Sequence, residues 1–305
     1  MSKEIFSKRR NSNKNNFLKI FLGVLAIIIL LWGGIKVVTM IGCNLANKAS
    51  INKEQKEQEK VIKPNPDDVM PRMNITYEAD KYAVDAKDVQ AMANDTYKGE
   101  GKYVFLTFDD GPGGKVTEEI LNTLKENDVK ATFFLIGELV EKHPDLVKRM
   151  NDEGHSIGVH TFTHERNKIY RNDSSFLEEN LKAQEAIEKV IGKKVFSLRF
   201  PFGSNNSTYT LKKSLVDSLH EQGFRIYDWT VDSTDALNPN LSPSSIVQKS
   251  ISNSDYIVLL MHCGYSNNNS AKALPSIIKH FKSAGYSFEV IDESTPEIYR
   301  LKNKC

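Results

Sequence analysis

Residues 103–112 read YVFLTFDDGP, and this stretch decides the fold. It begins with a run of apolar and β-branched residues and ends in two carboxylates followed by Gly-Pro, a pair that forms turns. A short apolar run that is closed by turn residues is typical of a buried strand. The sequence therefore predicts a strand at 103–108 whose end carries acidic side chains.

The same pattern recurs along the chain. Further apolar runs predict strands at 131–135, 156–160, 195–200, 224–228, 256–261 and 287–291. Amphipathic stretches between them predict helices at 117–126, 138–153, 174–191, 210–221, 243–252 and 271–283. This alternation indicates one α/β domain with a mainly parallel sheet, either open or closed as a barrel. We place the domain at 102–291 and a C-terminal tail at 292–305.

The composition fits a folded domain and argues against nucleic acid as a partner. The 305 residues are 40% hydrophobic and contain only 3 Cys, which excludes wholesale disorder and a disulfide framework. Residues 1–36 hold seven bases and one acid, so 34 of the 41 bases and 38 of the 39 acids remain, and the rest of the chain has a net charge of −4. A mildly acidic body without a basic stripe is poorly suited to holding phosphates.

The N-terminal region is predicted to anchor the protein in the cell membrane. A basic tail at 1–19 precedes an apolar run at 20–43, interrupted by Lys36, that is long enough to span a bilayer once. The positive-inside bias then places a stalk and lead-in at 44–101, and the domain after them, outside the cytoplasm. A cleaved signal peptide is an alternative, as is a lipoprotein attached through Cys43, because residues 40–43 read MIGC.

Polar residues gather at the predicted carboxyl ends of the strands, where α/β folds bind ligands. Asp109 and Asp110 end the first strand, and they can share a site only if the chain turns there. They are too close for a glycosidase pair, whereas one carboxylate binding a metal while the other handles protons fits their adjacency. A lone pair of this kind is also a common turn or helix cap.

Two histidines follow the third strand, and three later strands also end in polar residues. His160 and His164, four residues apart, can meet on one helical face or in a tight loop and hold a divalent ion together with an Asp. Arg199 can hold a carboxylate, and His262 is placed for acid–base work with Asp235 as its orienting partner. Each feature also has a purely structural interpretation, as a hydrogen-bonded histidine, a salt bridge or a turn cap.

Taken in order, the motifs TFDDGP, HTFTH, RFPFG, D-x-x-D and LLMH resemble those of the polysaccharide deacetylases, the carbohydrate esterase family 4 or NodB-homology group. The resemblance covers 102–291 and implies a distorted (β/α)7 barrel that removes N-acetyl groups from aminosugars by metal-dependent hydrolysis. Together with the exported location, it makes N-acetylglucosamine of cell-wall peptidoglycan the expected substrate. It equally permits N-acetylmuramic acid, poly-N-acetylglucosamine, chitin oligomers or O-acetyl xylan.

The resemblance also implies a role for each site residue. It implies that Asp110, His160 and His164 are the metal ligands. It implies that Asp109, held by Arg199, is the base toward a metal-bound water and that His262, positioned by Asp235, is the acid. The Phe202 N–H would then stabilise the oxyanion, and Leu260 would line the acetyl pocket. Zn²⁺ is the expected metal, with Co²⁺, Ni²⁺ or Mn²⁺ as alternatives, and no organic cofactor is expected.

Two positions depart from the family pattern. Ala236 stands where many members have Trp, which opens one wall of the substrate groove, and Cys263 stands where many have Asp. Cys263 is either a soft competing ligand or a small buried residue. The rival hypotheses are a surface glycan-binding protein without turnover and a non-haem Fe(II) oxygenase, which also uses two His and one carboxylate.

Overall fold

The computed structural model describes residues 101–238 and 240–301. The predicted basic tail, the predicted membrane segment at 20–43 and all but the last residue of the predicted stalk and lead-in lie outside these ranges, as do Cys43 and Cys305. Within the described residues, no helix is both long and apolar enough to cross a bilayer.

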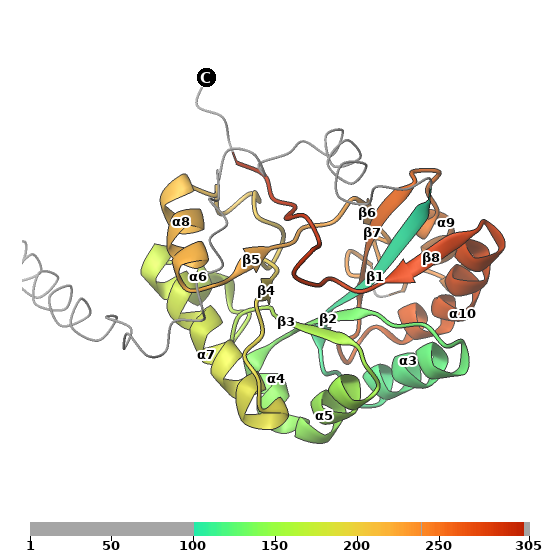
Figure 1. Ribbon diagram of the computed structural model, residues 1–305, viewed down its shortest axis with the longest axis horizontal. Helices are drawn as coiled ribbons and strands as arrows, with labels where there is room; N and C mark the ends of the chain where they lie inside the picture. The colour runs from blue at the N-terminus through green and yellow to red at the C-terminus, as the bar shows by residue number, and fades with distance from the viewer. Residues whose placement is uncertain (1–100, 239, 302–305) are drawn as a thin grey trace, which may run out of the picture. The chain divides into compact units, whose positions relative to one another are not determined.

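The core of the structure is one sheet whose strand pairs are all parallel (Figure 1). Its strands are β1 (Lys102–Gly111), β2 (Thr132–Leu135), β3 (Ser156–Val159), β4 (Ser197–Leu198), β5 (Arg225–Ile226), β6 (Val231–Asp232), β7 (Tyr256–His262) and β8 (Tyr286–Glu289). The order is β5-β4-β3-β2-β1-β7-β6. β1 is central, because β7 pairs along one edge while β8 and β2 pair with the first and second halves of the other.

Helices follow the strands and form an arc along one side of the sheet (Figure 1). They are α3 (Lys115–Glu126), α4 (Gly137–Lys142), α5 (Pro144–Asp152), α6 (Arg166–Ile169), α7 (Asp173–Ile191), α8 (Lys213–Glu221), α9 (Pro243–Ser250) and α10 (Asn268–Ser283). This placement follows from parallel pairing, because each strand must be reached by a crossover on the face of the sheet.

All predicted strands are present, and the differences from prediction have local causes. The helix expected at 138–153 is two helices, α4 and α5, because Pro144 has no N–H to donate to the preceding turn and therefore begins a new helix. The short elements β6 and α6 were not predicted, since two and four residues are too few to show a periodic pattern.

The expectation of a (β/α)7 barrel is met only as a curled, parallel half-barrel with outer helices. Within residues 101–238 and 240–301 no ladder joins β5 to β6, so the sheet stays open between these two ends. The strands at and near these ends, β4, β5 and β6, are only two residues long, which leaves too few backbone groups in register for a closing ladder.

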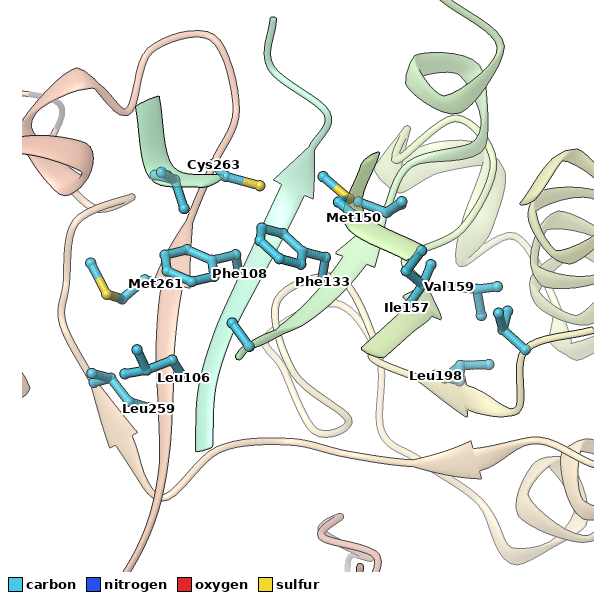
Figure 2. Packing of buried hydrophobic residues seen from close by; sticks show 14 of the residues in the cluster. Leu106, Phe108, Phe133, Met150, Ile157, Val159, Leu198, Leu259, Met261 and Cys263 are labelled. Carbon is cyan, nitrogen blue, oxygen red and sulfur yellow. The ribbon is translucent and has the colours of Figure 1, made fainter. Parts of the chain in front are cut away.

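Two apolar clusters cover the two faces of the sheet. On the outer face, Leu106 and Phe108 of β1 pack with Phe133 and with helix residues such as Met150 (Figure 2). On the inner face, Phe105 belongs to a smaller cluster without helical residues. Because side chains alternate along a strand, the inner face of β1 continues from Phe105 through Thr107 to Asp109. The inner face therefore changes from apolar to charged toward the carboxyl end of the strand.

Residues of the segment expected as a tail also pack against this body. Ile298 forms a parallel bridge with Tyr227, and Tyr299 is fully buried. The Glu297 carboxylate accepts hydrogen bonds from the Ile226 N–H at 2.6 Å and from His220 Nε2 at 3.0 Å. These contacts hold Glu297 and Ile298 against β5.

Candidate active site

A bulge in β1 separates the two adjacent carboxylates. Asp109 is still paired in register with His262 on β7, but the register with β2 shifts between Phe108 and Gly111. Asp110 has a left-handed backbone with φ of 64°, a conformation that is strained for a residue with a side chain. The chain therefore turns at Asp110, and this turn allows the two carboxylates to share one site.

Asp110, His160 and His164 lie together and can hold a metal ion. Their ligand atoms are all within 4.8 Å of one another. Asp110 Oδ1 is 3.5 Å from His160 Nε2 and 3.3 Å from His164 Nε2. Tetrahedral bonds of about 2.1 Å to zinc separate neighbouring ligand atoms by about 3.4 Å, so these spacings fit. Asp110 Oδ1 is also buried without a hydrogen-bond donor among the described residues, which is the environment expected of a ligand atom.

The surroundings of His160 favour the neutral imidazole, the form that binds a metal. Its Nδ1 lies 2.8 Å from the Arg199 carbonyl oxygen, which can only accept, so Nδ1 carries the proton and the Nε2 lone pair faces Asp110. Burial, together with the neighbouring charge of His164, lowers the pKa of His160 to about 3. The imidazole is therefore uncharged at neutral pH.

The loop that carries both histidines is held from α7 by a residue that sequence reasoning missed. Glu179 Oε2 accepts hydrogen bonds from the Phe162 N–H at 3.1 Å, the Thr163 N–H at 2.8 Å and the Thr163 hydroxyl at 3.0 Å. The loop needs this support because Thr161 and His164 both have positive φ, 65° and 58°. In the sequence, Glu179 is one more acidic residue on an amphipathic helix.

We expect Glu179→Ala to weaken metal binding by about tenfold to a hundredfold, because supports of ligand orientation have effects of this size. Titration of the metal-free protein with Zn²⁺ against a chromophoric chelator measures the change. Glu178→Ala, an exposed neighbour on the same helix, is the matched control. An unchanged zinc affinity in a folded Glu179→Ala variant would contradict a positioning role.

Asp109 is held by a fully buried arginine. Arg199 Nη1 donates to Asp109 Oδ1 at 2.9 Å and to the Thr107 hydroxyl at 2.6 Å. Its Nε and Nη2 donate to the carbonyl oxygens of Tyr227 at 2.7 Å and Asp228 at 3.0 Å. Burial raises the pKa of Asp109, while the charges of Arg199 and His262 oppose that rise. With Oδ1 engaged by Arg199, Oδ2 is the oxygen left to accept a proton.

His262 is paired with Asp235 through two hydrogen bonds. Asp235 Oδ1 accepts from His262 Nδ1 at 2.7 Å, and Oδ2 accepts from the His262 N–H at 2.8 Å and from the Ser270 hydroxyl at 2.6 Å. Burial disfavours the charged ring, but the hydrogen bond and charge of Asp235, with the charges of Asp110 and Asp109, raise the pKa of His262 to about 9. The ring is therefore protonated at neutral pH, and Nε2 is free to donate.

This pairing predicts the alkaline limb of the pH–rate profile. His262 can donate a proton only below its own pKa, so activity should fall as pH rises through about 9. Asp235→Asn removes the interaction that raises this pKa, and the alkaline limb should then move to lower pH. We would measure kcat/KM from pH 6 to 10 for both proteins; an unmoved limb in the variant would exclude His262 as the titrating acid.

The ring of Phe202 contacts the His164 ring, and Leu260 lies on β7. Phe202 has φ of 67°, and its N–H donates to no other described residue. Its loop is held by Asp228, another residue that was missed, which accepts from the Ser204 N–H at 3.0 Å and the Ser204 hydroxyl at 2.7 Å. Leu260 is buried on the same face of β7 as His262, two residues earlier.

The two departures from the family pattern have separate outcomes. Cys263 is buried, and its Sγ lies 3.4 Å from the Asp109 carbonyl oxygen, outside the Asp110–His160–His164 group. It is therefore a packed small residue here. Ala236 is exposed, and so is the side chain of Leu237 beside it.

Comparison with known proteins agrees with this geometry. Residues 96–218 match the family model for polysaccharide deacetylase. A peptidoglycan-N-acetylglucosamine deacetylase of Bacillus cereus is 42% identical over 202 residues, which cover 64% of this chain and 71% of that protein. A crystal structure of a polysaccharide deacetylase from Bacillus cereus shares 40% identity with a TM-score of 0.58, covering 64% of this chain and 94% of that one.

A third comparison extends this to another genus. The catalytic domain of peptidoglycan N-acetylglucosamine deacetylase from Eubacterium rectale is 31% identical with a TM-score of 0.61, and the match covers 67% of this chain and 94% of that one. The chain therefore belongs to the polysaccharide deacetylases, a family of metal-dependent hydrolases. The family expected from the motifs is confirmed, and the oxygenase alternative is wrong.

Proposed function

We propose that the protein removes N-acetyl groups from N-acetylglucosamine residues of cell-wall peptidoglycan, giving acetate and a free amine. The observation that carries this proposal is the pairing of two proton-handling groups beside the possible metal site. Asp109 on β1 is held by Arg199, and His262 on the neighbouring strand β7 is held by Asp235. The names of the relatives in Bacillus cereus and Eubacterium rectale support peptidoglycan as the substrate.

Asp110, His160 and His164 would hold the metal. When bound there, a divalent ion polarises a carbonyl oxygen and makes a coordinated water more acidic. Zn²⁺ is the ion we propose, because two imidazoles and one carboxylate with an open position are typical of catalytic zinc, while Co²⁺, Ni²⁺ and Mn²⁺ suit the same donors. Elemental analysis of the purified protein tests the assignment, and a different bound metal would contradict it.

The remaining residues divide the proton transfers between them. Asp109 Oδ2 takes a proton from the attacking water, since Oδ1 is engaged by Arg199. The Phe202 N–H donates to the oxygen that gains negative charge in the tetrahedral intermediate. His262 Nε2 then gives its proton to the leaving amine, while Asp235 holds Nδ1. Leu260, beneath His262 on the same face of β7, lines the pocket for the acetyl methyl group.

Substrate choice is tested by incubating the enzyme with purified peptidoglycan and, separately, with chitin oligomers, poly-N-acetylglucosamine and O-acetyl xylan. Muramidase digestion followed by mass spectrometry then places each lost acetyl group on glucosamine or on muramic acid. We expect the loss on glucosamine. Loss on muramic acid, or turnover of chitin oligomers with none on peptidoglycan, would overturn the assignment. Binding of glycan without any turnover would favour a glycan-binding protein.

We further propose that residues 20–43 anchor the protein in the cell membrane with the deacetylase domain outside the cytoplasm. The apolar run with bases before it supports this arrangement. The full chain should sediment with membranes and be cut by protease added to intact cells whose wall has been removed. Cys43→Ala separates the alternatives, because it would release a lipoprotein but leave a spanning helix in place.

A further inference from the structure

The hydroxyl of Tyr170 is bonded to the peptide group that carries the Phe202 N–H. Tyr170 directly follows α6, and its hydroxyl donates to the Pro201 carbonyl oxygen at 2.5 Å. This carbonyl and the Phe202 N–H belong to one planar trans peptide group, so they point in opposite directions. Fixing the carbonyl oxygen therefore also fixes the direction of the N–H, which donates to no other described residue.

The turn around Phe202 needs this support because its backbone is strained. Phe202 has φ of 67°, in the left-handed region that a residue with a side chain rarely adopts. Asn206 Nδ2 donates to the Gly203 carbonyl oxygen at 3.1 Å and lies 3.5 Å from that of Pro201. The Ser204 N–H is held by Asp228. The short hydrogen bond to the peptide group of Phe202 itself comes from Tyr170.

Tyr170 is in turn held rigidly and can act only as a donor toward this carbonyl. Its ring stacks on those of Tyr209 and Phe176, with centroids 5.0 and 5.7 Å away and interplanar angles of 12° and 7°. Burial raises the pKa of Tyr170, so the hydroxyl keeps its proton. A hydrogen bond to the carbonyl oxygen polarises the peptide group, and this makes its N–H a stronger donor. The hydroxyl thus both orients and strengthens the Phe202 N–H.

We propose that Tyr170 is a positioning residue for the reaction, because its hydroxyl orients and polarises the Phe202 N–H that stabilises the oxyanion. This inference rests on the proposed function and adds a residue that acts through the backbone of another. Residues 160–170 then have two tasks. They supply two of the possible metal ligands, and through Tyr170 they hold the turn whose Phe202 ring contacts the His164 ring.

The test removes the hydroxyl alone, in Tyr170→Phe, and measures acetate release from peptidoglycan and hydrolysis of 4-nitrophenyl acetate, a small acyl substrate. We expect kcat to fall by about threefold to tenfold for both, the effect of one lost hydrogen bond. KM should stay nearly unchanged, because the oxyanion develops only in the transition state. Tyr209→Phe is the matched control, since the neighbouring ring loses a hydroxyl that is bonded to Asp173 Oδ1 instead. It should keep the kcat of the wild type.

Binding of methylphosphonate, a tetrahedral anion, to the zinc-loaded proteins needs no turnover and is measured by calorimetry. Weaker binding by Tyr170→Phe than by Tyr209→Phe, at equal zinc content and equal melting temperature, supports the proposal. Unchanged kcat and unchanged methylphosphonate affinity in Tyr170→Phe would overturn it, as would a loss that follows zinc content. A wild type that hydrolyses only 4-nitrophenyl acetate would overturn the proposed substrate, whereas the ester kinetics and the methylphosphonate affinities would still decide the role of Tyr170.

Discussion

Asp109→Asn is expected to lower the rate of deacetylation by about 10²- to 10⁴-fold, the range typical of a lost general base, while metal stays bound. The amide oxygen of Asn can still accept the hydrogen bond from Arg199 Nη1, so the local geometry survives. An amide cannot accept a proton from the attacking water at neutral pH. Acetate release and metal content, measured on the same preparation, separate the two effects.

Asp110→Asn is the matched comparison, because it changes the adjacent residue in the same way. Asp110 Oδ1 lies among the possible ligand atoms, so this variant should lose affinity for the metal together with activity. The two variants are expected to differ in metal content rather than in rate. Turnover near the wild-type rate in Asp109→Asn would remove Asp109 from the role of base.

Arg199→Met is expected to lower the free energy of unfolding by about 3–5 kcal/mol, because breaking a buried ion pair leaves the other charge uncompensated. The arginine side chain is fully buried and donates to Asp109, Thr107 and two backbone carbonyl groups. A methionine fills a similar volume but offers none of these donors. Urea unfolding followed by circular dichroism measures the change, and Arg171→Met, an exposed arginine, should leave stability unaltered.

Arg199→Lys extends the test to a variant that keeps the charge. An ammonium group cannot reproduce the planar fork that reaches Asp109 and the carbonyls of Tyr227 and Asp228 together. Activity should therefore fall even where the protein folds. If Arg199→Met unfolds at the same urea concentration as the wild type, the buried network does not stabilise the fold as described.

The strands were predictable because a buried parallel strand leaves a strong pattern in one sequence. The run at 103–108 is apolar on both faces, and both of its faces are indeed covered by apolar clusters. By contrast, β6 has two residues and leaves no pattern. A proline inside a helical pattern usually breaks the helix, and this rule applies at Pro144. The amphipathic pattern nevertheless continues across Pro144, and it favoured one long helix.

The candidate site was predictable in its residues but not in its supports. Asp110, His160 and His164 lie in short motifs next to strand ends, so their proximity followed from the parallel topology. Glu179 and Asp228 hold the loops of these motifs through hydrogen bonds to backbone groups that are distant in sequence. Such partners depend on how α7 and β5 pack, which neither composition nor spacing reveals.

Acetate release from peptidoglycan, by the protein treated with chelator and then resupplied with Zn²⁺, tests the central claim most directly. We predict that release stops when the metal is removed and returns when it is restored, with new free amines on glucosamine. Release that persists in the chelated protein after elemental analysis finds no metal would contradict the account. So would a zinc-loaded protein that releases no acetate from peptidoglycan.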